Sequence, residues 1–150
     1  MEMERYDLTW DGLNFAYEFY SEGPNGRIKK GISFQHMQEI GSNVFNLAFG
    51  DVDESTGRID DRAISNNNDQ IKVLNTVAIT VIDFLEKRPN VIVLMQGSTL
   101  SRTRLYQMRI SFHWLTINQY CEVYGEKGKE WLPFEKGLNY ERFLVFKKSK

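Results

Sequence analysis

The sequence is poor in the residues that build disulfides and transition-metal sites. It has one cysteine and two histidines among its 150 residues. A lone cysteine cannot form an internal disulfide, so we expect Cys121 to be a small buried residue in a reducing compartment. Two histidines are too few for a transition-metal centre of the usual kind, and no cofactor is expected.

Long apolar runs are also missing. The longest, residues 91–95, is far too short to cross a bilayer. The first five residues, MEMER, lack the basic and apolar segments of a signal peptide. These absences predict a cytoplasmic protein with no membrane partner.

Neither sign of charge dominates the chain as a whole. The net charge is −1, which argues against a general nucleic-acid coat protein. The charges are unevenly placed, however: residues 1–96 hold nine Lys/Arg and fifteen Asp/Glu, whereas residues 97–150 hold ten and five. The two parts can attract each other within one fold, or the basic part can form a face for an anionic partner, and composition leaves both open.

The sequence is rich in core material with clear periodicity. Ten Phe, seven Tyr and three Trp suffice for the core of one domain spanning residues 1–150. Alternating apolar residues on either side of turn residues predict two β-hairpins. Their strands are residues 13–20 with 28–34, and residues 44–52 with 58–64.

After the hairpins the apolar period changes to that of a helix. Asn67 and Gln70 have the spacing of a capping box. The helix that follows should end at Arg88, because a residue before proline disfavours helical geometry. A second helix is expected over residues 100–118, and short strands at 91–96, 120–124 and 143–147. The order ββββαβαββ predicts an α+β fold with a mixed, mainly antiparallel sheet and two helices packed on it.

The second predicted helix carries an unusual polar row. At 100° per residue, Arg102, Tyr106, Arg109 and His113 stack between two apolar stripes and should point inward. One apolar stripe expected in the core is Leu105, Met108, Phe112 and Leu115, and the expected solvent face is Thr103, Gln107, Ser111 and Asn118.

Two interpretations of this row are open. A buried guanidinium needs an acceptor, so Arg102 and Arg109 can form a structural network with sheet carboxylates such as Asp51 or Asp53. Alternatively, the two arginines bind an anion.

The anion interpretation has support from the junction before the helix. The strand, the Gly97-Ser98-Thr99 turn and the helix N-terminus would offer backbone N–H groups and two hydroxyls, those of Ser98 and Thr99, to the same anion as Arg102. The chain has no Gly-Lys-Ser/Thr triplet, so the junction is not a P-loop.

Three functions follow from these interpretations. The first is a binding domain for a phosphate-bearing ligand, either a nucleotide or a nucleic-acid segment, held by Ser98, Thr99, Arg102 and Arg109. The second is a protein-interaction module with a structural arginine network and a protein partner or a second copy of itself. The third is a metal-independent phosphodiesterase or ribonuclease in which His113 or Tyr106 moves the proton. The sequence does not decide whether the protein is an enzyme.

The acidic segment of the second hairpin invites a metal hypothesis. Its glycine, Gly57, falls one position late for a calcium loop, and Arg62 stands where that loop needs glutamate. A charged hairpin tip is the main interpretation. A magnesium site at Asp51 and Asp53 is left open.

Four segments resemble a known family. They are residues 23–28, 45–51, 69–77 and, most specifically, GSTLSRTRLY at 97–106. The chain is similar over most of its length to an uncharacterised family of small bacterial proteins, found chiefly in Bacteroidetes. The resemblance implies a bacterial cytoplasmic protein and carries over no catalytic residue.

Overall fold

A computed structural model describes residues 3–10, 15–61 and 66–149. The helices are α1 (Gln70–Lys87), α2 (Leu100–Phe112) and α3 (Trp114–Tyr120). The strands are β1 (Thr9–Trp10), β2 (Ala16–Gly23), β3 (Gly26–His36), β4 (Val44–Val52), β5 (Ile59–Asp60), β6 (Ile92–Met95), β7 (Cys121–Lys127), β8 (Glu130–Pro133) and β9 (Arg142–Lys147).

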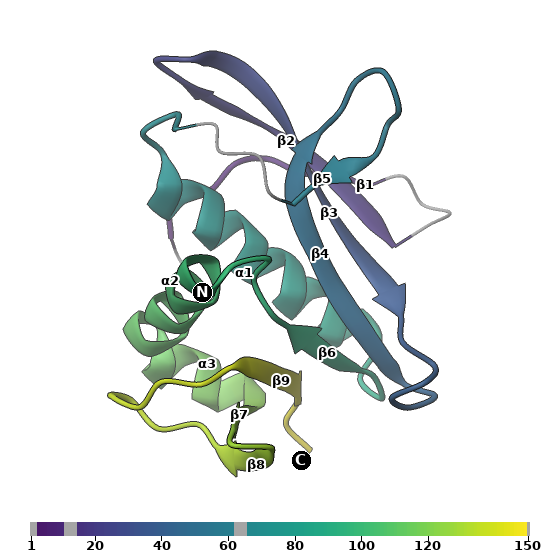
Figure 1. Ribbon diagram of the computed structural model, residues 1–150, viewed down its shortest axis with the longest axis vertical. Coiled ribbons are helices and arrows are strands. Elements are labelled where there is room, and N and C mark those ends of the chain that lie inside the picture. Colours follow the sequence, from purple (N-terminus) through teal and green to yellow (C-terminus); the bar gives the residue numbers. More distant parts are fainter. Residues whose placement is uncertain (1–2, 11–14, 62–65, 150) are drawn as a thin grey trace.

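The described strands form one mixed sheet. Its order is β1-β2-β3-β4-β6-β9-β7-β8, with β5 added beside β4. Neighbouring strands are antiparallel except β4 and β6, which are parallel. The chain passes through α1 on its way from β4 to β6, as a parallel pair requires a crossover. The helices lie together to one side of the long strands β2, β3 and β4 (Figure 1).

The first helix is fixed by its apolar stripe, as the sequence predicts. Val77 and Phe84 are almost fully buried, and the Phe84 ring stacks on Phe34 of β3 with centroids 3.9 Å apart. The helix ends at Lys87, and the N–H of its C-cap, Arg88, still bonds to the Phe84 carbonyl. In the described part of the chain no helix combines the length and apolar character needed to span a bilayer.

The predicted capping box is wrong. Asp69, not Asn67, caps α1, and it makes no side-chain cap bond. Asn67 is 3% exposed and instead binds the β2–β3 hairpin: its Nδ2 donates to the Gly26 carbonyl at 2.8 Å, and its Oδ1 accepts from the Asn25 N–H at 2.8 Å. The amide is used for a contact distant in sequence, which local spacing does not encode.

The fold class is as predicted, but the element order differs. There are three helices in the described residues rather than two, because the segment expected as one helix divides at His113, whose φ of −99° and ψ of 18° are not helical. The division lets Trp114 pack on Phe134, with ring centroids 4.8 Å apart, and lets Ile117 enter the core. Strands β1 and β8 are additional, and β5 is short; part of the predicted return strand 58–64 lies outside the described residues.

Candidate functional site

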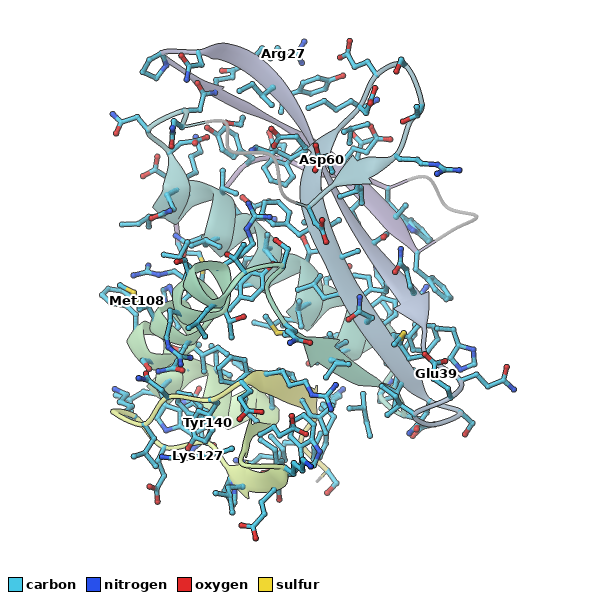
Figure 2. The ribbon with its side chains drawn as sticks, viewed as in Figure 1. Arg27, Glu39, Asp60, Met108, Lys127 and Tyr140 are labelled. Carbon is cyan, nitrogen blue, oxygen red and sulfur yellow. The ribbon has the colours of Figure 1, made fainter. Side chains whose placement is uncertain are left out.

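The faces of the segment predicted as one helix, residues 100–118, are not those that the sequence predicts. Two residues assigned to solvent are buried: Thr103 is 2% exposed and Gln107 is 9% exposed. The apolar residues expected in the core are outside instead. Met108 is 59% exposed, Phe112 70% and Leu115 81%, and Met108 lies at the outer edge of the molecule (Figure 2).

Backbone groups from other segments explain the buried polar face. Thr103 Oγ accepts from the Gly97 N–H at 3.0 Å. Gln107 Oε1 accepts from the Tyr140 N–H at 3.1 Å, and its Nε2 donates to the Asn139 side chain at 3.0 Å. A buried backbone group must be paired, so these polar side chains face inward and the helix turns its apolar stripe outward.

The junction between β6 and α2 has the local form that the sequence predicts. Thr99 is the N-cap, and its hydroxyl accepts from the Arg102 N–H at 3.2 Å. The Ser98 hydroxyl donates to the Asp61 carbonyl at 2.6 Å, and Arg102 Nη1 donates to the same oxygen. Glycine is required at position 97, because a Cβ there would lie 2.5 Å from the Thr103 nitrogen.

Arg102 faces a cavity of about 500 Å³ between α1, α2 and the sheet, here called the interhelix cavity. It is lined by Lys30, Phe49, residues 66–70, Val73, Leu74, Thr99, Ser101, Arg102 and Leu105. The N-terminal ends of both α1 and α2 open on it, because Gln70, Thr99 and Ser101 are in its wall. Two cationic side chains, Lys30 and Arg102, line it as well.

The carboxylates of Asp51 and Asp53 have partners other than the arginines of α2. Lys30 is 6% exposed and pairs with Asp51, its partner on the adjacent strand. Asp53 Oδ1 accepts from the Ser55 N–H at 2.9 Å and from its hydroxyl at 2.7 Å, and these bonds lower the pKa of Asp53. Among the described residues no group of three His, Cys, Asp or Glu side chains is placed to hold a metal ion. Asp51 and Asp53 are thus engaged in local contacts.

A second cavity of about 760 Å³ lies beside β4, and we call it the sheet-edge cavity. Its lining includes Ser33, Gln35, Asn46, Phe49, Asp61, Gln96, Ser98, Arg102 and Tyr106. Tyr106 is 5% exposed, and burial raises the pKa of its phenol to about 12. Arg102 and Phe49 line both cavities.

Arg109 and His113, the other two residues of the predicted row, are not among the described residues that line the two cavities. The Arg109 guanidinium lies 4.7 Å from the ring centroid of Phe112, and Arg109 is not among the described residues lining either cavity. His113 Nε2 donates to the Asn75 side-chain oxygen at 3.3 Å. Burial, followed by the nearby positive charge of Arg109, lowers the pKa of His113. The structure therefore brings Ser98, Thr99 and Arg102 together, with Tyr106 behind them, but not Arg109 or His113.

The chain belongs to DUF6934, a family of unknown function. The family model matches residues 2–148. No curated protein and no solved structure matches the chain. Membership in DUF6934 confirms the predicted resemblance to a family without an assigned activity; the bacterial distribution stays a prediction.

Sequence reasoning missed two parts of the interhelix cavity in this DUF6934 protein. Lys30 is on the same face of β3 as the buried Ile32 and Phe34, and a lysine at such a position in the alternating pattern was the available signal. Residues 66–70 were identified only as the start of a helix, because their place beside Arg102 depends on contacts that are distant in sequence.

Proposed function

We propose that the protein binds a small phosphate-bearing ligand in the interhelix cavity. One observation carries the proposal: Lys30, Arg102 and the N-terminal ends of two helices meet at a single cavity. Helix N-termini favour anions through their unpaired N–H groups and the positive end of the helix dipole. A guanidinium adds a planar pair of donors that matches phosphate.

The size and lining of the cavity favour an organic phosphate over inorganic phosphate. Its volume of about 500 Å³ is within the range of small-molecule sites. Phe49, Val73, Leu74 and Leu105 make one part of the wall apolar, which suits the carbon atoms next to the phosphate of an organic ligand.

The geometry favours binding over hydrolysis. A phenol with a pKa of about 12 keeps its proton at neutral pH, so Tyr106 is a poor general base. His113 is bonded to Asn75 and does not line the cavity among the described residues. The protein-interaction alternative stays a prediction, and the exposed side chains Met108, Phe112 and Leu115 are the surface on which it would be tested.

A thermal-shift titration tests the proposal. The probes are inorganic phosphate, nucleoside monophosphates and a short single-stranded RNA. A ligand at about 100 times its Kd stabilises by about 2.7 kcal/mol, which for this chain length raises Tm by about 5–10 °C. We expect the rise in the wild type and its loss in Arg102→Ala.

Arg109→Ala is the matched control, because it removes an arginine of the same helix that lies outside both cavities. It should keep the full rise in Tm. The melting temperature of each variant without ligand shows that it is folded. An absent rise with all three probes would overturn the proposal, and so would equal loss of binding in the two arginine variants.

A further inference from the structure

The sheet-edge cavity exists because β4 is only partly covered along one edge. Strand β3 pairs with the other edge of β4. On the opposite edge of β4, β6 pairs with residues 44–46 and β5 pairs with residues 51–52. Residues 47–50 of β4 lie between these two short pairings. Gln96, Gly97 and Ser98 are part of the lining of this cavity. Arg102 and Phe49 line both this cavity and the interhelix cavity.

Tyr106 presents a polar group to this cavity from the core. The residue is only 5% exposed, and it lines the cavity. Within the described ranges its hydroxyl has no hydrogen-bond partner, and the influences on its pKa are burial and the charges of Arg102 and Asp61 alone. Among the described residues the buried polar atoms without a partner are Tyr17 Oη and Arg88 Nη1. The Tyr106 hydroxyl is not one of them, so it opens on the cavity, where it can donate to or accept from a ligand group.

The rest of the wall suits a flat ring with hydrogen-bonding edges. Ala16, Ser33 and Ala48 are paired across three neighbouring strands, and these small side chains form a shallow floor. Gln35 and Asn46 are paired beside them and supply amides that both donate and accept. Amide side chains of this kind bond to the edges of nucleobases.

We infer that the ligand is a nucleoside phosphate whose phosphate binds at Arg102 and whose nucleoside occupies the sheet-edge cavity against the Tyr106 hydroxyl. This inference rests on the proposed function and adds the class of ligand to it. Arg102 is the residue that joins the two parts, since it lines both cavities. A sugar phosphate shares the same hydrogen-bonding chemistry and is distinguished by experiment.

Calorimetric titration measures how much the phosphate and the nucleoside each contribute to affinity. The probes are inorganic phosphate, the four common nucleoside 5′-monophosphates and a hexose phosphate. At least one nucleoside monophosphate should bind about tenfold or more tightly than phosphate. Tyr106→Phe removes only the hydroxyl, and it should weaken nucleotide binding about tenfold, the effect of one lost hydrogen bond, while leaving phosphate binding unchanged.

Tyr124→Phe is the control, because it makes the same change on β7, outside the described lining of both cavities. It should leave both affinities unchanged. Equal affinity for phosphate and all nucleotides, or nucleotide binding that is indifferent to Tyr106→Phe, would overturn the inference and leave the proposed function intact. Tight, Tyr106-dependent binding of the hexose phosphate alone would also overturn it. No binding of any phosphate-bearing probe would overturn both proposals.

Discussion

Helix α2 has buried polar residues on its inner face and exposed apolar residues on its outer face, the opposite of an ordinary amphipathic helix. The inner face has Thr103 and Gln107, which are buried and hydrogen-bonded to backbone groups of neighbouring loops. The outer face has Met108 and Phe112, which are more than half exposed. An amphipathic helix is normally placed by its apolar stripe. Here the polar bonds to the loops before and after the helix decide its orientation, so changes on the inner face should matter most.

The largest expected effect is that of Gln107→Ala. It leaves the buried Tyr140 N–H without its acceptor and the Asn139 side chain without its donor. We expect the free energy of unfolding to fall by about 2–4 kcal/mol, since each unpaired buried group costs about 1–3 kcal/mol. Urea denaturation measures the change. Met108→Ala, one residue along, should change the free energy by less than about 0.5 kcal/mol, and the reverse order would contradict the comparison.

A pH series examines the inner face through Tyr106. Its pKa is about 12 when folded and about 10 when unfolded. The folded state holds the phenol proton more tightly, so this stabilisation is complete below pH 10 and is lost as the pH rises to 12. We expect a loss of about 2–3 kcal/mol over that range in the wild type relative to Tyr106→Phe, measured by denaturation. Parallel curves for the two proteins would contradict burial of the phenol.

A third change, Thr103→Val, keeps the shape of the side chain and removes its hydroxyl. The Gly97 N–H loses its acceptor and the Thr99 carbonyl loses a donor at 3.2 Å. The expected loss is about 1–2 kcal/mol. Thr116→Val in the half-exposed part of α3 is the matched control and should be nearly neutral. Equal losses in thermal or urea denaturation would show that the junction bond contributes no stability.

The smallest effect should come from Leu115, an exposed residue of α3. Leu115→Ser replaces a side chain that is 81% exposed, and it should change the free energy of unfolding by no more than about 0.5 kcal/mol. Denaturation at two protein concentrations, with sedimentation velocity, measures the effect. A larger loss that grows with protein concentration would mean that a second copy covers this face in solution.

The elements with strong local signals were predictable. The helix α1 has a long apolar stripe, and its end is set by the residue before proline. The β2–β3 hairpin follows from alternation around its turn. Strand β1 has two residues and β8 has four, ending in Pro133, so neither has enough alternation to stand out.

The site was predictable only in part, because some of its residues are close in sequence and others are brought together by the fold. Ser98, Thr99 and Arg102 are near each other in sequence, and the strand–turn–helix pattern identifies their junction. Lys30 reaches the same cavity only through the strand order, and the orientation of α2 depends on Tyr140, 33 residues beyond Gln107. Because α2 has apolar residues on both sides, its periodicity fits either orientation.

The position of β9 has a consequence for how the protein is made. In the described sheet β9 alone joins β7 and β8 to β6. While the ribosome still holds residues 142–147, strands β1 to β4 can already pair, but β7 and β8 have no hydrogen-bonded connection to them. The β7–β8 hairpin can therefore join the rest of the sheet only after this strand is released, and during synthesis the edge of β6 is left open to pairing with other chains.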